Sequence, residues 1–417
     1  MSLWPNRAGE PILINDMRRI SRSRYVAIFL LVGVGIVASL AFAAGLSHRN
    51  AYRYLNVFQE VWALTNANYV EAVDEPELLQ GAYQGMLASL DAVSGYLSDE
   101  QLALLQKSPG PARPGFELLP SGGVPIIVRI DPGGPADAVG LKVGDQIWKV
   151  ADTPTRNLAL PLLERLVAGS PGERLDLVVF GGSEFKLRKI SLELSVPTDA
   201  GFTLEDKGDG LLYLRLRSIE RVDPVLLGRR LRAAQVTHST SALLIDLRAV
   251  IGLDPASVSR FSGLLFAGGS LMRFVPRIGK TEVITAPTAT QPVLPTAVYV
   301  LTDASTAGMG EALAALLSEK SSAVSCGRKT YGLGVLPEVI PLREGGQILL
   351  STRAIETSAG TRWAGEGLTP AKSFPVRSTL DLDKGKKGST DHLLEQTLAW
   401  IRDGAPLEVA KPAAAAS

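Results

Sequence analysis

Residues 297–317 read A-V-Y-V-L-T-D-A-S-T-A-G-M-G-E-A-L-A-A-L-L, and this stretch decides the fold of the largest region of the chain. Residues 297–301 are apolar and predict a buried strand. Residues 302–310 are mostly small and predict a turn, and residues 311–317 predict a helix. A strand, a tight turn and a helix in this order can raise a side chain above the edge of a sheet, beside the N–H groups that open the helix.

The same alternation of strand and helix patterns extends on both sides of this stretch. We expect strands at residues 211–216 and 242–248 and a helix at 224–234. This pattern predicts an α/β core over residues 196–375, with a sheet flanked by helices. Residues 391–402 predict a terminal amphipathic helix.

Composition excludes several classes of protein. The chain has 43 basic and 42 acidic residues and a net charge of +1, which argues against a nucleic-acid-binding surface. The single cysteine, Cys326, excludes an intramolecular disulfide and a cysteine-based zinc site. It lies in an apolar run, residues 323–327, so we interpret it as a core residue.

The N-terminal region predicts export. Tyr25 to Leu46 contains no charged residue and is long enough to span a bilayer as a helix. Four arginines precede it within residues 18–24, so the N-terminus should stay in the cytoplasm. Residues 41–43 read A-F-A, so a cleaved signal peptide is the competing interpretation. In both cases most of the chain lies in the periplasm or outside the cell.

A second motif lies at residues 132–147, P-G-G-P-A-D-A-V-G-L-K-V-G-D-Q-I. It resembles the P-A-x-x-A-G-L-x-x-G-D-x-I signature of PDZ domains. Its glycines supply turns, and Asp145 is expected to accept hydrogen bonds from loop amides. The Pro-rich linker 107–114 precedes this predicted domain, which we place at residues 115–195.

A PDZ domain binds a peptide by strand addition, with the terminal carboxylate held by loop N–H groups. The residues predicted to do so are Gly115, Phe116, Glu117 and Leu118. Gly115 lets the peptide backbone approach, and Phe116 and Leu118 would line the pocket for its last side chain. The alternative is that these two side chains belong to the core, which the period of a strand requires of at least one.

In order and in sequence, these pieces resemble the carboxyl-terminal processing proteases, also called tail-specific proteases. The resemblance covers residues 50–405 and includes a helical lead-in, 47–106, before the PDZ domain. It implies a closing strand within residues 347–360. It also implies serine peptidase chemistry, with a Ser nucleophile and a Lys base. The family's turn reads N-x-G-S-A-S-A-S-E, with the catalytic Ser three residues before the Glu; its Lys follows in T-F-G-K-G.

Aligned on Glu311, this chain lacks the residues that the resemblance implies for catalysis. Gly308 stands at the nucleophile position and Leu333, twenty-five residues later, stands at the base position. Pro337 replaces a supporting Gln. The family's L-D-L-R-N-N-P-G-G loop, whose glycines help form the oxyanion hole, is changed at residues 249–253 to A-V-I-G-L, which leaves Gly252 as its residual position.

Two interpretations of function remain. The first is a catalytically degenerate homologue, a membrane-tethered scaffold that binds peptides through its PDZ domain or assists an active protease. The second is an active serine endopeptidase that uses a displaced pair, Ser305 and Lys329. No metal or nucleotide motif is found, so we expect no cofactor and no metal.

The expected partners are protein C-termini or unfolded peptides, a second copy or an active protease, and the membrane, with no nucleic acid. The expected location is the bacterial inner membrane, as a single-pass protein whose main part faces the periplasm. The predicted segments are a cytoplasmic tail (1–24), an anchor or signal (25–46), a helical region (47–106), a linker (107–114), a PDZ domain (115–195), a peptidase-like α/β core (196–375), a C-terminal helical segment (376–405) and a disordered tail (406–417).

Overall fold

The computed structural model describes residues 53–182, 185–237, 240–266, 268–287, 294, 297–343, 345–375 and 391–405. The chain divides into two compact units, Met1–Leu78 and Leu79–Ser417. The predicted anchor, Tyr25 to Leu46, and the predicted tail, 406–417, lie outside the described residues. Within the described ranges, no helix has the length and apolar character needed to cross a membrane.

The predicted helical region contains helices at residues 53–68, α2 (Glu75–Ala88) and α3 (Asp99–Gln106). It is not entirely helical, because β1 (Gly95–Leu97) forms a strand between α2 and α3. β1 pairs antiparallel with residues 347–349 of the core. This strand depends on a partner about 250 residues away, which the local pattern could not indicate.

The PDZ domain is a sheet in the order β2-β3-β4-β6-β7, with β5 beside β4. β2 pairs only with β3, so β2 is an edge strand. As predicted, Asp145 accepts hydrogen bonds from the N–H groups of Lys142 (3.0 Å) and Gly182 (2.9 Å). The elements of the domain are β2 (Phe116–Ser121), β3 (Val124–Ile130), α4 (Pro135–Ala138), β4 (Gln146–Val150), β5 (Thr153–Pro154), α5 (Leu160–Leu166), β6 (Arg174–Gly181) and β7 (Lys186–Glu193).

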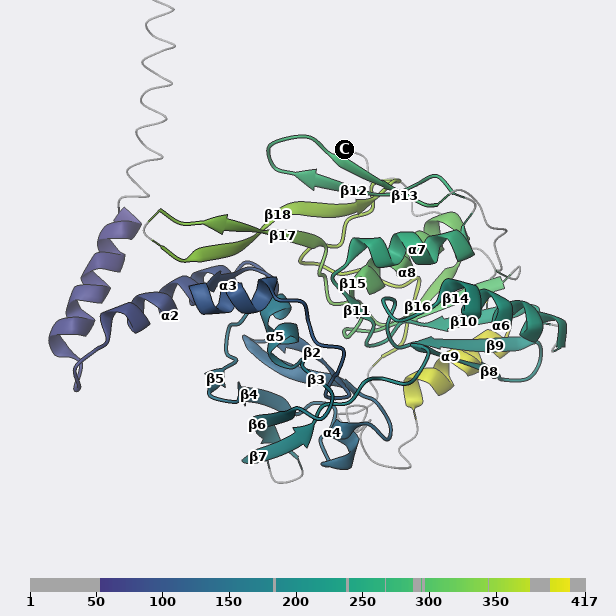
Figure 1. Ribbon diagram of the computed structural model, residues 1–417. Coiled ribbons are helices and arrows are strands. Elements are labelled where there is room, and N and C mark those ends of the chain that lie inside the picture. The colour runs from purple at the N-terminus through teal and green to yellow at the C-terminus, as the bar shows by residue number, and fades with distance from the viewer. Residues whose placement is uncertain are drawn as a thin grey trace, which may run out of the picture. The chain divides into compact units, whose positions relative to one another are not determined.

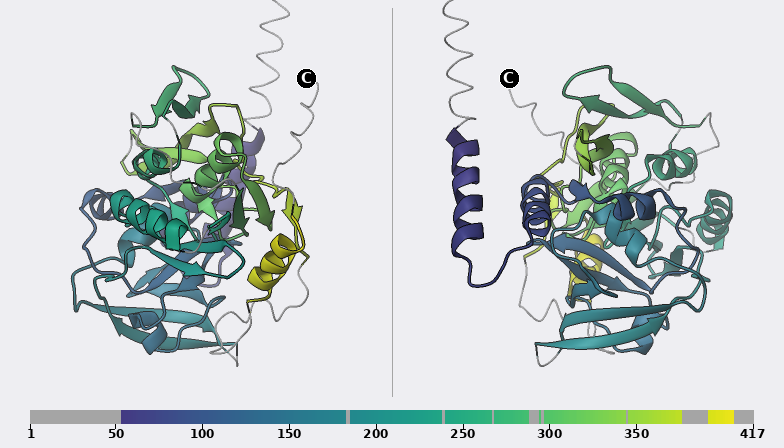
Figure 2. Two further views of the ribbon diagram at one scale, coloured as in Figure 1. Left: turned by 90° about the vertical axis from the view of Figure 1, so that its right-hand side faces the viewer. Right: turned by 60° about the vertical axis from the view of Figure 1, so that its left-hand side comes forward.

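The α/β core contains a six-stranded sheet in the order β19-β16-β14-β10-β9-β8, parallel except for β8. Helices α6, α7 and α8 cover one face and α9 covers the other (Figures 1 and 2). Every residue of β14 is buried, as expected of a central strand covered on both faces. The elements are β8 (Phe202–Asp206), β9 (Leu211–Leu216), α6 (Pro224–Thr237), β10 (Ala242–Asp246), α7 (Pro255–Leu265), β14 (Ala297–Thr302), α8 (Met309–Lys320), β16 (Val324–Gly327), β19 (Lys372–Ser373) and α9 (His392–Arg402).

A second sheet of the core follows the order β1-β18-β12-β13, and β17 pairs with β18. Two further short strands, β11 and β15, pair with each other in parallel. The predicted closing strand is β18, and Cys326 is buried in β16, as predicted. The bounds are β11 (Ile251–Gly252), β12 (Ser270–Pro276), β13 (Glu282–Thr285), β15 (Ala307–Gly308), β17 (Val335–Pro341) and β18 (Gln347–Thr357).

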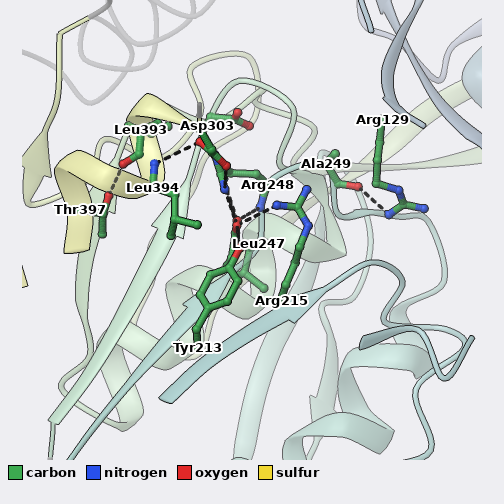
Figure 3. Close-up of polar contacts among 12 residues, drawn as sticks. Arg129, Tyr213, Arg215, Leu247, Arg248, Ala249, Asp303, Leu393, Leu394 and Thr397 are labelled. Atoms are coloured by element: carbon green, nitrogen blue, oxygen red, sulfur yellow. Dashed lines mark hydrogen bonds and ion pairs between the residues drawn. The ribbon is translucent and has the colours of Figure 1, made fainter. Parts of the chain in front are cut away.

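Strand β10 ends at Asp246, two residues earlier than predicted, because Asp246 binds the residues that follow it. Its buried carboxylate accepts hydrogen bonds from the Arg248 N–H (3.0 Å), the Arg248 guanidinium (2.6 Å) and the Tyr213 hydroxyl (2.7 Å). Arg248 also binds Asp391, the residue that caps α9, at 2.7 Å (Figure 3). This network fixes the carboxyl end of β10, where the loop of residues 249–253 begins.

Candidate functional site

Gly308 lies in the sharp turn between the central sheet and helix α8. It is the N-cap of α8, with φ 58° and ψ −118°, a conformation that favours glycine. A strained turn between a strand and a helix is the arrangement that exposes the nucleophile of several hydrolases. Gly308, the position that the resemblance implies for the nucleophile, therefore has the backbone geometry of a nucleophile turn. As a glycine, it has no side chain that could act as the nucleophile.

The structure brings the predicted nucleophile and base positions together. A Cβ atom on Gly308 would lie 3.6 Å from Cδ2 of Leu333, whose side chain is buried. Pro337 follows a break in the register of β17 against β18. All three positions line one cavity of about 870 Å³. The spacing in the sequence thus corresponds to proximity in space.

The loop of residues 249–253 fills the space beside Gly308. Gly252 pairs with Gly308 through β11 and β15, and the Ala307 N–H donates to the Val250 carbonyl (3.0 Å). A Cβ atom on Gly308 would overlap the Gly252 carbonyl oxygen, and one on Gly310 would overlap that of Val250. An oxyanion hole needs N–H donors next to the reacting atom. Here the group next to position 308 is an acceptor.

The carboxylate of Glu311 joins the turn at Gly308 to the loop that carries Leu333. Its two oxygens accept hydrogen bonds from the N–H groups of Gly308 (3.0 Å), Gly332 (2.7 Å) and Leu333 (2.7 Å), and from the Thr330 hydroxyl. Glu311 is fully buried, and this burial raises its pKa to about 7, although the four donors act in the opposite direction. One side chain therefore holds both positions in place.

The alternative pair, Ser305 and Lys329, is placed differently. The Ser305 hydroxyl donates to the Asp303 carboxylate and accepts from the Ala249 N–H (2.9 Å), so it anchors the 249–253 loop. Lys329 is exposed. Neither residue lines the cavity that contains Gly308 and Leu333.

The predicted peptide-binding residues lie at the free edge of the PDZ sheet. Gly115 has φ 77°, and a Cβ atom there would lie 3.1 Å from Cδ of Pro135. Phe116 and Leu118 are each 6% exposed and pack in the core of the domain. Both also line the cavity, so each side chain is a core residue and a pocket residue at once. Glu117 binds Arg129 of the adjacent strand at 3.1 Å.

Arg129 extends from the PDZ domain into the α/β core. Its guanidinium donates to the carbonyl oxygen of Ala249 (3.4 Å; Figure 3) and to that of Arg217, and it lies 3.1 Å from Asp131. Strand β2, which is predicted to bind peptides, and the 249–253 loop are therefore connected through one buried side chain.

Gly115 to Leu118 line the same cavity as Gly308, Leu333 and Pro337. The sequence suggested two separate sites, and the structure joins them into one. Three carboxylates of this cavity come from different elements: Glu117 from β2, Glu164 from α5, and Glu220 from the loop before α6. Sequence reasoning missed Glu164 and Glu220, because no local pattern marks a residue that only the tertiary fold brings to a cavity.

The surroundings raise the pKa of all three carboxylates. Desolvation is the largest cause for each, and it raises the pKa of Glu164 to about 8 with added repulsion from Glu117 and Glu220. Glu164 is exposed to solvent, so water screens part of this effect. Among the described residues, no group of three or more His, Cys, Asp or Glu side chains is arranged to hold a metal ion.

Comparisons with protein families match three regions. The model for peptidase family S41 matches residues 210–372, a PDZ domain model matches 126–179, and the model for the activating protease CtpB N-terminal domain matches 42–101. The carboxy-terminal-processing protease of Bartonella bacilliformis is 26% identical over 365 residues, which are 82% of this chain and 81% of that protein. The carboxy-terminal processing protease CtpA of Bacillus subtilis is 23% identical over 338 residues, which are 78% and 71% of the two chains.

The solved structure of a photosystem II D1 C-terminal processing protease has the same fold. It aligns with a TM-score of 0.55 and 21% identity, over 76% of this chain and 92% of that chain. The chain therefore carries a peptidase family S41 domain and a PDZ domain, and its homologues include carboxy-terminal processing proteases.

We expect Glu311→Gln to remove one component of the pH dependence of stability. A Glu in the unfolded chain titrates near 4.5, whereas burial raises the pKa of Glu311 to about 7. Between these values the folded state binds more protons, so the free energy of unfolding falls as the pH rises through them, by about 3 kcal/mol for this group. Urea unfolding at pH 5 and pH 8 measures this fall. An equal fall in the variant and the unmodified chain would contradict the assignment.

Proposed function

We propose that this chain is an exported, membrane-tethered homologue of the carboxy-terminal processing proteases that does not use Ser/Lys catalysis. It binds protein C-termini or unfolded peptides through its PDZ domain and acts as a scaffold or as a partner of an active protease. The observation that carries this proposal is the geometry at Gly308, where the Gly252 carbonyl oxygen occupies the place of a nucleophile side chain.

The chemistry of the cavity supports the same proposal. Attack on an amide needs a nucleophile, a base and donors for the oxyanion. Among the described residues that line the cavity, the only hydroxyl belongs to Ser218, and no Lys or His is present. The Ser218 hydroxyl accepts a hydrogen bond from the Arg221 N–H (3.3 Å). Binding a peptide requires only the strand edge and the pocket, which remain.

The second candidate is an active serine endopeptidase of the same family that uses Ser305 and Lys329. Ser305 lies in the correct turn and has an acidic neighbour, Asp303. The Ser305 hydroxyl is bound by the Ala249 N–H, and neither Ser305 nor Lys329 lines the cavity. These contacts favour the non-catalytic proposal.

We expect the purified full-length chain to lack peptidase activity on casein and on a test protein with an unfolded C-terminal tail. Removal of a nucleophile and its base leaves only a small residual acceleration from binding. Ser305→Ala and Lys329→Met should therefore leave the rate at the background value. Because Lys329 is exposed, its variant reports on chemistry and not on folding. Turnover that is lost in both variants would establish the second candidate instead.

The proposed location rests on residues 25–46 and on the arginines before them. Their composition supports an anchor in the bacterial inner membrane, with the PDZ domain and the core in the periplasm.

The proposed need for a partner has separate support within the first unit. Along the helix at residues 53–68, six large apolar side chains are exposed by 42–73%: Tyr54, Leu55, Val57, Phe58, Val61 and Leu64. Such a surface suits contact with a second copy or another envelope protein.

Cell fractionation tests the anchor directly. We expect the full-length chain to sediment with the inner membrane at its full mass, because an uncleaved apolar span is held in the bilayer. The matched control lacks residues 1–46 and should be soluble when it is produced in the cytoplasm. Recovery of a shortened, soluble form from the periplasm would instead establish a cleaved signal peptide.

A further inference from the structure

The free edge of β2 determines how a peptide would lie in the cavity. A strand added to this edge with its carboxylate at Gly115 extends along Phe116 to Leu119, antiparallel to β2. Side chains of the peptide alternate between two faces. One face meets Phe116 and Leu118, and the other meets Glu117 and the wall of the α/β core.

More carboxylates than arginines line the cavity that would receive this peptide. Six carboxylates and four arginines line it. Three of the arginines are already bound: Arg113 to the Ala112 carbonyl (2.9 Å), Arg221 to Asp199 (3.3 Å), and Arg353 to Glu282 (3.2 Å). Four of the carboxylates also have an arginine partner: Glu117 and Asp131 pair with Arg129, Glu282 with Arg353, and Asp254 with Arg260. Among the described residues of the lining, Glu164 and Glu220 have no such ion pair, and Arg165 and Arg113 act on Glu164 only as nearby charges.

Glu164 is the carboxylate of this cavity with the least compensation. Glu117 has Arg129 at 3.1 Å, and Glu220 accepts hydrogen bonds from the backbone of Leu253 and Asp254. Within the described part of the chain, no cation lies within 4 Å of Glu164. Glu164 lines the cavity together with Glu117 and Glu220, and their repulsion contributes to its raised pKa, so a ligand cation would relieve repulsion there.

We propose that the groove selects C-terminal tails with a Lys or Arg side chain upstream of an apolar last residue, and that Glu164 determines this specificity. This inference rests on the proposed function, because it assumes that the PDZ domain binds peptides. A residue of an added strand spans about 3.3 Å, so a basic residue two to four positions before the end reaches the region between Glu117 and Glu164. Its ammonium or guanidinium group would pair with Glu164 and lie near Glu117 and Glu220.

The ionisation of Glu164 predicts that the affinity for a basic tail depends on pH, which gives a second way to test the proposal. In the free chain the pKa of Glu164 is raised to about 8, first by desolvation and then by Glu117 and Glu220, while Arg165 and Arg113 lower it. A cation binds the ionised form, so binding of a basic tail releases a proton. The affinity for such a tail should therefore rise between about pH 6 and pH 9.

The test measures fluorescence anisotropy with the full-length chain in detergent micelles. Two labelled ten-residue peptides end in the same free Val and differ only at the third residue from the end, which is Lys in one and Glu in the other. We expect the Lys peptide to bind about three- to ten-fold more tightly. Glu164→Gln should abolish both this preference and the rise with pH. Glu193→Gln, which changes an exposed carboxylate of β7 outside the cavity, should change neither.

The outcomes separate the inference from the proposed function. If both peptides bind equally well, or if Glu164→Gln keeps the preference, the inference is overturned and peptide binding stands. A third peptide, the Lys peptide with an amidated C-terminus, tests the binding mode itself. If amidation leaves its affinity unchanged, or if no peptide binds, both the proposed function and the inference are overturned.

Discussion

The buried carboxylate of Glu311 is the interaction on which the arrangement of the site depends. It receives the N–H groups of Gly308, Gly332 and Leu333, so the first turn of α8 and the loop before β17 cannot move apart without leaving donors unpaired. Burying a carboxylate is costly, and its raised pKa reflects that cost. The four donors offset it. The two positions that the resemblance implies for a nucleophile and a base are thus held together, although they carry Gly308 and Leu333.

Close backbone approach is the second constraint. Gly252 could not carry a Cβ atom without lying 2.8 Å from Cβ of Met309, and Gly308 and Gly310 face carbonyl oxygens of the same loop. The Ser305 hydroxyl holds this loop at Ala249, whose φ of 55° is unusual for a residue with a side chain. The loop therefore packs against the start of α8 as a short parallel strand, and its acceptors occupy the place where a reacting carbonyl would need donors.

Much of this architecture could be predicted from the sequence. The strand, turn and helix at 297–317 follow from local pattern, and helix α8 begins at Met309, two residues before the predicted start. The spacing from Gly308 to Leu333 came from the resemblance, and the structure places the two positions beside each other. The hydrogen bond from the Lys142 N–H to Asp145 was also predictable, because it is local to the loop of the PDZ motif, whereas the one from Gly182 depends on the fold of the domain.

The rest depends on long-range contacts that no local pattern encodes. Strand β1 exists because β18 pairs with it, and the peptide groove joins the cavity at Gly308 because the PDZ domain packs through Arg129 onto the core. The direction of the Gly252 carbonyl depends on its pairing with Gly308. Glu164 is an ordinary exposed helix residue in the sequence, and only the fold places it beside two other carboxylates.

The most direct test of the central claim restores the missing side chains. The double variant Gly308→Ser with Leu333→Lys supplies a nucleophile and a base at the two positions that the structure brings together. The account predicts no cleavage of an unfolded-tail substrate above that of the unmodified chain, because the Gly252 carbonyl and the altered 249–253 loop still exclude the nucleophile and provide no oxyanion donors. Circular dichroism would establish that the variant is folded. Robust cleavage by the folded double variant would contradict the account.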